Sequence, residues 1–498
     1  MLHRLLVNTG SNVLFKVFSM VLALVSVPVL VSAVGADGYG VILLAGSVLG
    51  YFNLLNGGVP AGVVKYVAEF EARGDDRQVN RVIGTSIAFF VVAGLLVGAT
   101  VAAFASLGGV RVFRPSAELL GPATRVLYTA AGLALLSWPL SVLGQTLDGL
   151  QRYPENKVAR GIGDILAKVG AIGAALADLP LEVIFFVSQA GFLATSVIQY
   201  RVVRGVLPTW RLSFSNVDRE TLHLIFGYSL WMLLSQLAVV LTYQTDRVLI
   251  GLFLPLQALT IYHVITTPFR YVQQISGLYN SALMPAISAS EARGGQGTID
   301  QFVYTATRYS NAFFAPAAIL AAFFAAPFIR LWVGEEYLAY VWVAQVACLF
   351  QLLWQSNATL GQAFYGTGQV RTVTVIAASM AVLNVGLSVW WVQWLGVAGV
   401  VLATVAVGAL SVPLQYALAF SDLAVDRGRY VVGVVRGQWP SWVAGLVMLA
   451  VWGPIQSIAS WATLALASLG AAAVIYAATW FLTVKPQHRL ALLTAVGR

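Results

Sequence analysis

The chain has 498 residues, of which 59% carry hydrophobic side chains and only 10% are charged. Soluble proteins average roughly 25% charged residues, so this composition excludes soluble multi-domain enzymes, disordered chains and nucleic-acid-binding modules. The formal net charge of +9 then fits the basic cytoplasmic loops of a membrane protein. The single cysteine, Cys348, permits no internal disulfide. We expect an all-α polytopic membrane protein with no cofactor and no metal site.

Fourteen segments are long and apolar enough to cross a bilayer, which takes about 20 residues for a helix. In chain order they are 11–34, 38–60, 82–106, 124–147, 157–178, 181–203, 221–246, 258–284, 303–327, 339–365, 370–392, 396–420, 438–458 and 461–483. The loops between them are short, so we expect no soluble domain on either face. Membrane glycosyltransferases usually carry such a domain, and this argues that the protein is not an enzyme.

The basic residues gather in alternate loops. Of the 29 Lys and Arg residues, 21 fall in loops on one side of the predicted bundle and only 4 in loops on the other. Cytoplasmic loops carry the excess of Lys and Arg in membrane proteins. The asymmetry therefore predicts a multi-pass protein of the cytoplasmic (inner) membrane with both termini in the cytoplasm, and it supports an even number of spans.

Short sequence patterns recur in the same order in the two halves of the chain. The recurring pairs are 60–61 with 285–286, 71–74 with 291–294, 143–145 with 360–362, and 193–195 with 402–404. Because six spans separate the copies, the copies have the same orientation. Parallel repeats of this kind are a transporter architecture that holds the substrate between the halves.

The repeat divides the chain into four parts. They are an N-terminal lobe of helices 1–6 (1–203), a cytoplasmic linker (204–220), a C-terminal lobe of helices 7–12 (221–420), and helices 13–14 with a cytoplasmic tail (421–498). We therefore expect two parallel six-helix lobes around a central cavity, with two further helices at the C-terminus.

Polar residues follow single faces of several predicted spans. The first span carries Asn12 and Lys16, the eighth carries Arg270, Gln273 and Gln274, and the tenth carries Gln351 and Gln355. Polar residues at membrane depth face a bundle interior or an aqueous cavity. They also join helices by hydrogen bonds. For the first and eighth spans we favour a cavity, because each carries a cation; for the tenth, both interpretations stay open.

Each charged residue within a span also has a structural interpretation. Lys16 lies near the cytoplasmic end, from which its long side chain can reach the interface. Lys168 follows Asp164 by one helical turn, a spacing that predicts an ion pair within the helix. Asp246-Arg247 can form a structural pair at the outer end of the seventh span. Arg270 lies mid-span, and no acidic residue is near it in the sequence.

Several short motifs give the chain a family resemblance. They are Asn12 with Pro28, the turn 35–40, Gly57-Gly58 followed by 65–68, the segment 147–152, Tyr228 and Trp231 followed by 245–247 and 249–251, Pro285, and the turn 395–399. With these motifs, residues 1–420 resemble the polysaccharide-export flippases of the multidrug/oligosaccharidyl-lipid/polysaccharide exporter superfamily. One departure is Asn56, where an Asp often precedes the glycine in such chains.

The resemblance implies two six-helix lobes that alternate between inward-open and outward-open states. It implies that polyprenyl-diphosphate-linked sugars are the substrate, with the lipid tail in the bilayer and the head group between the lobes. In related lipid II flippases the last two helices form an outer groove for the tail, and 438–483 are expected to do the same. The expected partners are the lipid-linked glycan, membrane lipids and glycan-assembly enzymes, with no nucleic acid.

The alternative is a cation- or proton-coupled multidrug antiporter of the same superfamily. That class generally uses membrane-embedded carboxylates, whereas the first and eighth spans here carry cations, which favours an anionic substrate. We expect Arg270 to be the primary contact of the diphosphate, because a guanidinium binds phosphate oxygens in a bidentate manner. Further predicted contacts are Lys16, Lys168, Asn12, Gln273, Gln274, Gln351 and Gln355, and the candidate coupling residues are Asp246 and Asp164.

Overall fold

The computed structural model describes residues 2–52, 59–210, 217–225, 245–292, 296–423, 425–487 and 489. All regular elements within these ranges are helices, which confirms the predicted all-α class. The chain divides into two compact units, Met1–Thr260 and Ile261–Arg498. This division falls later in the chain than the linker predicted at 204–220, and the predicted lobe bounds stay a prediction.

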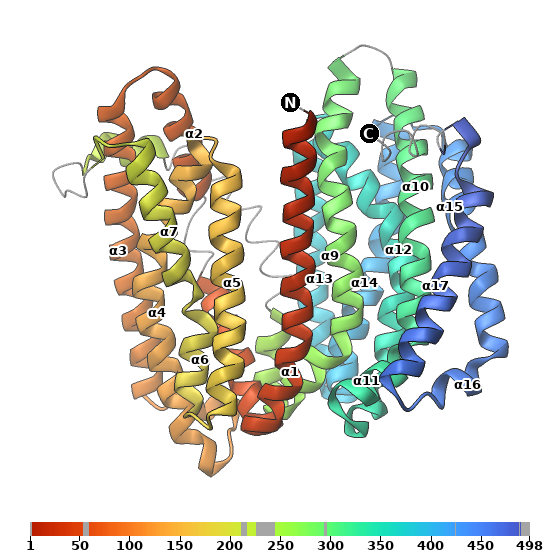
Figure 1. Ribbon diagram of the computed structural model, residues 1–498, viewed down its shortest axis with the longest axis horizontal. Helices are drawn as coiled ribbons and strands as arrows, with labels where there is room; N and C mark the ends of the chain where they lie inside the picture. The colour runs from red at the N-terminus through yellow and green to blue at the C-terminus, as the bar shows by residue number, and fades with distance from the viewer. Residues whose placement is uncertain are drawn as a thin grey trace. The chain divides into compact units, whose positions relative to one another are not determined.

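The first unit consists of helices from α1 to α7 (Figure 1). They are α1 (Leu2–Phe52), α2 (Val59–Ala72), α3 (Asp76–Ser106), the short 3-10 helix η2 (Gly109–Phe113), α4 (Ala117–Gly149), α5 (Tyr153–Leu176), α6 (Leu181–Gln189) and α7 (Gly191–Val206). The predicted first and second spans both lie largely in α1. They are separated at Gly35, whose φ of 71° and ψ of 167° interrupt the helix at a residue that tolerates positive φ.

Small residues let neighbouring helices of the first unit approach closely. A Cβ atom on Gly98 of α3 would lie 3.0 Å from the carbonyl oxygen of Ala131 in α4. About two turns earlier in α3, the rings of Phe90 and Trp138 meet edge to face. Helices α1 and α7 both pack against α5. Close contacts between small residues are typical of helix packing in membranes. There the hydrophobic effect does not drive helices together, so they associate through close van der Waals packing.

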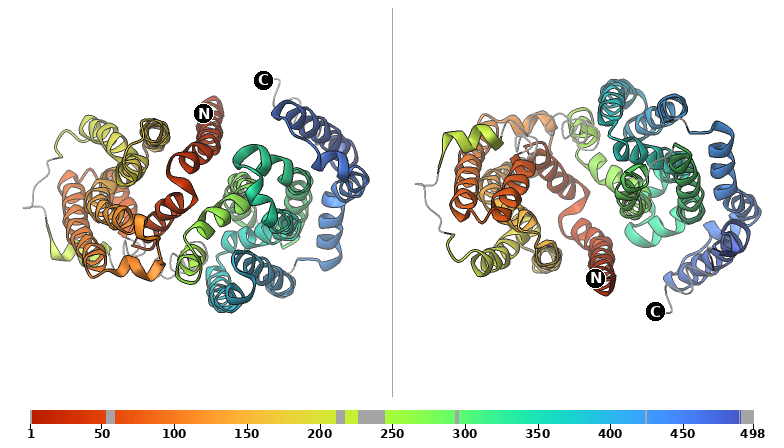
Figure 2. Two further views of the ribbon diagram at one scale, coloured as in Figure 1. Left: turned by 90° about the horizontal axis from the view of Figure 1, so that it is seen from below. Right: turned by 90° about the horizontal axis from the view of Figure 1, so that it is seen from above.

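The second unit is built from the later helices (Figures 1 and 2). They are α9 (Gln257–Ala292, which begins just before the unit), α10 (Gln296–Phe323), α11 (Ala325–Val333), the 3-10 helix η4 (Glu335–Tyr340), α12 (Val341–Gly366), α13 (Val370–Leu395), α14 (Val397–Asp422), α15 (Arg427–Ala450), α16 (Trp452–Gln456) and α17 (Trp461–Thr483). The predicted ninth span covers α10 and the start of α11, which meet at a bend of 60°.

Helices α15 and α17 pack against α10 and against each other. A Cβ atom on Gly437 of α15 would lie 2.6 Å from the carbonyl oxygen of Arg308 in α10, so only glycine permits this approach. The Arg308 guanidinium in turn donates to the carbonyl oxygen of Thr483, at the end of α17. An apolar cluster that includes Ile319, Met448 and Ile475 joins the three helices nearer the other end.

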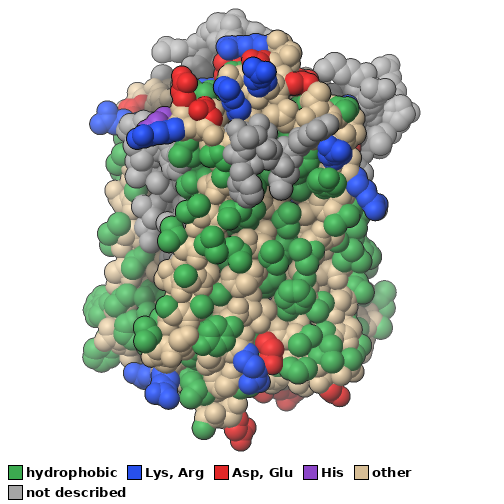
Figure 3. All heavy atoms as spheres, turned by 90° about the vertical axis from the view of Figure 1, so that its left-hand side faces the viewer, with side chains coloured by type: hydrophobic (Ala, Val, Ile, Leu, Met, Phe, Trp, Pro, Cys, Tyr) green, Lys and Arg blue, Asp and Glu red, His purple; other side chains and the backbone are tan. Residues whose placement is uncertain are grey.

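Eight helices in the described ranges are long and apolar enough to cross a membrane, and nine if the bent pair α10 and α11 forms one span. Figure 3 shows one face of the first unit, where hydrophobic side chains form a band between two charged ends. Within the first unit, Val92, Leu95 and Leu96 of α3 are more than half exposed. These features show a membrane-spanning protein. Helix α5, which carries Asp164 and Lys168, and helix α9, which carries Arg270, are not among the eight. The number fourteen stays a prediction.

The end of the predicted linker is tied to the first unit. The backbone N–H of Asp218 donates to Thr85 Oγ1 of α3 at 3.0 Å. The Asp218 carboxylate accepts hydrogen bonds from the side chain and backbone N–H of Thr221, at 2.7 and 2.9 Å. These bonds, led by the Thr221 hydroxyl, favour the ionised form and lower the pKa of Asp218. Asp218 therefore caps the short helical segment that follows it.

Candidate substrate site

Arg270 lies partly buried on α9, where its charge meets an aromatic side chain. Its Nη2 atom donates to the hydroxyl of Tyr262 at 3.2 Å, and its Cζ atom lies 5.5 Å from the centre of the Tyr262 ring. No carboxylate forms a salt bridge with Arg270 within the described ranges. The guanidinium is thus oriented by a tyrosine while its positive charge is left without a negative partner there.

Gln273 and Gln274 follow Arg270 on the same helix. Gln273 is partly buried and Gln274 is exposed. Gln274 lies one turn beyond Arg270, so the two side chains share a face of α9. Pairing a guanidinium with neighbouring amides gives an array of donors that suits phosphate oxygens and hydroxyl groups.

Lys168 and Asp164 form the ion pair that their spacing predicts, which the structure confirms on α5. Both side chains also contact Ser19 of α1. The Ser19 hydroxyl donates to Asp164 Oδ2, and Lys168 Nζ donates to Ser19 Oγ at 3.2 Å. This set of three residues ties α1 to α5. The side chains of Lys16 and Asn12, which precede Ser19 on α1, lie outside the described residues.

The glutamines of α12 lie in the interior of the second unit. Gln351 and Gln355 are each 1% exposed. Gln355 accepts a hydrogen bond from Ser276 of α9 and donates one to Ser310 of α10. Gln351 Nε2 donates to Gln355 Oε1 at 3.2 Å. Gln355 thereby joins three helices, as an interhelical contact does.

The structure describes Asp246, the other predicted coupling residue, but not all of the family positions. Asp246 is 4% exposed and belongs to the first unit. Among the family positions, 56–58, Tyr228 and Trp231 lie outside the described residues. Within the described ranges, no three His, Cys, Asp or Glu side chains lie together in a way that could hold a metal ion.

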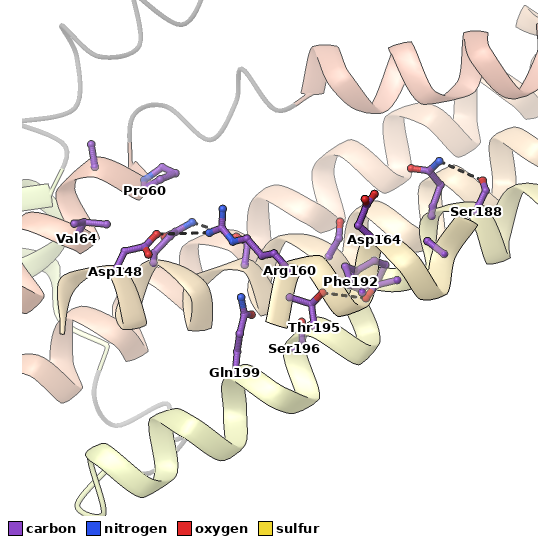
Figure 4. A pocket seen from close by; sticks show the side chains of 18 of the residues that line it. Pro60, Val64, Asp148, Arg160, Asp164, Ser188, Phe192, Thr195, Ser196 and Gln199 are labelled. Carbon is purple, nitrogen blue, oxygen red and sulfur yellow. Dashed lines mark hydrogen bonds and ion pairs between the residues drawn. The ribbon is translucent and has the colours of Figure 1, made fainter. Parts of the chain in front are cut away.

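A pocket of about 900 Å³ opens in the first unit among α2, α4, α5, α6 and α7 (Figure 4). Most of its lining side chains are polar. They are Lys65, Ser137, Ser141, Gln145, Asp148, Arg160, Asp164, Ser188, Gln189, Thr195, Ser196 and Gln199. The volume lies in the usual range of small-molecule sites, about 300–1,000 Å³. Of the residues predicted for the site, only Asp164 is in this lining.

Asn156 of α5 holds one end of the pocket together. Its amide nitrogen donates to the carbonyl oxygen of Gly144 at 2.9 Å and to Asp148 Oδ1 at 2.7 Å. Its oxygen accepts a hydrogen bond from Gln199 Nε2 at 2.7 Å. Arg160 Nη2 lies 3.6 Å from Asp148 Oδ2, beside this network. Helices α4, α5 and α7 are thereby fixed around the opening.

Two glycines that line the pocket, Gly163 and Gly191, bring α5 and α7 together. A Cβ atom on Gly163 would collide with the Thr195 hydroxyl and with the carbonyl oxygen of Gly191. The Thr195 hydroxyl donates to the carbonyl oxygens of Ala159 and Gly191, at 3.2 and 3.1 Å. The close crossing lets the polar side chains of both helices reach the same space.

The sequence contains a pattern that indicates part of the pocket: four polar residues on one face of α4. Ser137, Ser141, Gln145 and Asp148 recur at spacings of four, four and three residues, which places them on one face of α4. The segments 143–145, 147–152 and 193–195, which contain or border these and other lining residues, also belong to the repeat and family motifs. A polar face on one helix does not show which other faces it meets.

Comparisons with known sequences agree with this architecture. Residues 164–342 match the sequence model of a family described as polysaccharide biosynthesis protein. The uncharacterized membrane protein EpsK of Bacillus subtilis (strain 168) is 21% identical over 425 residues, which cover 84% of this chain and 83% of EpsK.

Solved structures show the same fold. The lipid II flippase MurJ, in an inward closed conformation, matches with a TM-score of 0.70 and 14% identity over 94% of this chain and 97% of MurJ. An inward-facing multidrug resistance MATE family transporter of the MOP superfamily matches with a TM-score of 0.65 and 14% identity, over 81% of this chain and 94% of the transporter. The chain therefore spans the membrane with the fold of these MOP-superfamily transporters, and its residues 164–342 are similar to polysaccharide biosynthesis proteins, which agrees with the resemblance that its motifs indicated.

Proposed function

We propose that the protein is a flippase that moves polyprenyl-diphosphate-linked oligosaccharide from the cytoplasmic to the outer leaflet, by alternating access, for surface polysaccharide synthesis. The fold shared with a lipid II flippase and the partial match to polysaccharide biosynthesis proteins support this proposal. The lipid-linked glycan and the surrounding lipids are then its partners, together with glycan-assembly enzymes.

The observation that carries the proposal is the environment of Arg270. A cation at the centre of a membrane helix costs roughly 2.5–3.5 kcal/mol on insertion scales, so an arginine in the middle of the predicted eighth span points to a function. Arg270 is partly buried and held by Tyr262, without a salt bridge in the described ranges. A diphosphate would supply the missing negative charge, and the planar guanidinium would bind its oxygens through two parallel hydrogen bonds.

The other contacts follow from this assignment. Gln273 and Gln274 extend the donor array along α9, and Lys16, Asn12 and Lys168 supply polar and cationic groups from α1 and α5. Gln351 and Gln355 contribute amides from α12, although Gln355 already bonds Ser276 and Ser310. Asp164 and Asp246 are the proposed coupling residues.

The antiporter alternative needs a carboxylate that can bind a cation. The likeness to a MATE transporter keeps this alternative open at the level of fold. In the first unit, however, Asp164 already pairs with Lys168, and Asp148 lies 3.6 Å from Arg160. These basic neighbours argue against a cationic substrate at the two carboxylates, and Arg270, which has no salt bridge in the described ranges, favours an anionic one.

The proposal also includes the orientation in the inner membrane, with both termini in the cytoplasm. Reporter fusions at residues 75, 155, 210 and 295 should all give a cytoplasmic signal, because the basic loops lie on that side. A single periplasmic signal would contradict both the orientation and the six-helix repeat.

The function is tested by complementation. In a host that lacks its own flippase but still makes the lipid-linked glycan, expression of the protein should restore glycan export. Vesicles that contain the purified protein separate the two functions: a flippase moves labelled polyprenyl-diphosphate-linked oligosaccharide without a cation substrate. Proton- or sodium-driven uptake of an organic cation, with no movement of the glycan, would instead establish the antiporter.

A further inference from the structure

The geometry points to a second binding site: the pocket of the first unit binds neutral sugar rings. Among the residues that the structure describes, none of those assigned above to the lipid-linked substrate lines this pocket, whereas Asp164, a proposed coupling residue, does. The inference rests on the proposed function in one respect: the sugars that bind here are taken to be part of the transported glycan. Binding itself is a property of the pocket and can be measured without transport.

The lining has the hydrogen-bonding capacity that a sugar requires. Five hydroxyl groups and three amides face or border the cavity, from Ser137, Ser141, Ser188, Thr195, Ser196, Gln145, Gln189 and Gln199. The hydroxyls of Ser141, Ser188 and Thr195 already donate to backbone carbonyl oxygens, so they offer acceptors to a ligand. An amide side chain has both donors and an acceptor, and a sugar hydroxyl can match either. Phe192 adds an aromatic surface, against which the apolar face of a ring can pack.

The charges of the lining favour a neutral ligand. Two basic residues, Lys65 and Arg160, are matched by two acidic residues, Asp148 and Asp164. Both carboxylates have basic neighbours: Arg160 lies 3.6 Å from Asp148, and Lys168 pairs with Asp164. An organic cation would have to displace these neighbours, and a phosphate would have to lie beside the carboxylates. A polyhydroxylated neutral ring meets neither obstacle.

Gln145 supplies the second, independent observation. Its side chain is 8% exposed, and its amide nitrogen donates to Ser141 Oγ at 3.2 Å. Its amide oxygen, Oε1, is buried without a hydrogen-bond partner. Leaving a buried acceptor unsatisfied costs about 1–3 kcal/mol. A ligand hydroxyl that donates to this oxygen would recover that cost, which makes Gln145 a specificity-determining residue for the sugar.

The test uses the full-length protein, purified in a detergent without a sugar head group. Free hexoses, N-acetylhexosamines and their trisaccharides, which carry no phosphate or lipid, are titrated and their binding is followed by calorimetry. We expect wild-type protein to bind at least one of these probes. Gln145→Leu keeps the approximate shape and should weaken that binding by about tenfold, the loss of roughly one hydrogen bond.

Two further variants keep the test decisive. Ser196→Phe fills the pocket without altering its charge and should abolish binding, which covers the case in which Gln145→Leu does not fold. Thr146→Val is the matched control, since Thr146 is fully buried on the same helix, bonds Val142 of that helix and does not line the pocket. It should bind sugar as wild-type protein does.

Two outcomes would overturn the inference. One is the absence of binding to any probe by folded wild-type protein, and the other is unchanged binding by both pocket variants. The proposed function fails or survives separately. Pocket-dependent sugar binding without glycan export would refute the flippase and keep the sugar site. Normal export by Ser196→Phe protein that binds no sugar would keep the flippase and show that the bound sugar is not part of the transported glycan.

Discussion

Asn156 of the first unit and Asn311 of the second are buried asparagines with different surroundings. Asn156 is 2% exposed and bonds Asp148 and Gln199, both of which line the open pocket. Its partners therefore lie between the protein interior and a space that can hold water or ligand.

Asn311 is completely buried and has partners that are buried as well. It donates to Ser356 Oγ at 3.0 Å and to the carbonyl oxygen of Thr307 at 2.9 Å. Its own oxygen accepts a hydrogen bond from Gln438 of α15 at 2.8 Å. Ser356 and Gln438 are 0% and 3% exposed. Both asparagines thus join helices, but only Asn156 has partners that line a cavity.

The cations of the two units differ as well, but here the first unit has the paired side chain and the second unit the one without a salt bridge in the described ranges. Lys168 of the first unit pairs with Asp164, whereas Arg270 of the second is held by Tyr262 and forms no salt bridge in the described ranges. A polar stripe on a membrane helix is therefore not by itself evidence of a cavity. What matters is whether its hydrogen bonds and charges are already satisfied inside the protein.

The largest expected effect tests the contrast between the two cations. Arg270→Ala should insert normally and abolish glycan export, because the unpaired guanidinium is lost. Arg270→Lys should restore only part of the export, since the charge remains but the bidentate geometry does not. Export is measured as surface glycan in the complemented host, at equal protein expression.

Arg371 provides the matched control for this experiment. It is an exposed arginine of the same unit, at the start of α13, and Arg371→Ala should export normally. Wild-type export by Arg270→Ala would remove Arg270 from the mechanism. The contrast between paired and unpaired cations would then have no functional meaning.

A smaller effect tests the contrast between the two asparagines. Asn311→Ala should lower the stability of the protein by about 2–3 kcal/mol, because the groups it bonds stay buried and lose their partner. Asn156→Ala should cost only about 1 kcal/mol, because water in the pocket can hydrate Asp148 and Gln199. The midpoint of thermal unfolding in detergent should therefore fall further for Asn311→Ala. Equal shifts would show that the pocket is not hydrated.

The smallest expected effect is on the unfolding temperature and comes from the Asp218 carboxylate, which lies outside the buried networks of both asparagines. The pKa of Asp218 is lowered by the hydrogen bonds from Thr221, so its contribution to stability is complete above the ordinary pKa of about 3.8. That contribution is lost as the pH falls through the lowered pKa. The difference in unfolding temperature between wild-type protein and Asp218→Ala should thus be constant near neutral pH and shrink as the pH falls below about 3.8. A difference that grows on acidification would contradict the capping role.

Features that depend on neighbours along one helix could be predicted from the sequence. The apolar segments gave the all-α membrane class, and the four-residue spacing gave the ion pair between Asp164 and Lys168. Both follow from periodicity within a single element. The break at Gly35 also lies in a turn that the motifs had identified.

Features that depend on contacts between helices could not be predicted. The pocket takes its lining from five helices, and no periodicity shows which of their faces meet. Tyr262 was missed for a different reason. It precedes Arg270 by eight residues, about 12 Å along a helix, so only the length of an arginine side chain that points back toward the N-terminus brings the two together.

The close contact between α15 and α10 bears on whether the C-terminal helices are a detachable module. Gly437 admits the backbone of α10, Gln438 bonds Asn311, and the Tyr430 hydroxyl donates to the carbonyl oxygen of Ser356 at 3.0 Å. A chain that ended after α14 would leave these buried groups without partners. Helices α15 and α17 are thus an integral part of the second unit, and any shortened relative that lacks them must have replaced these contacts with others.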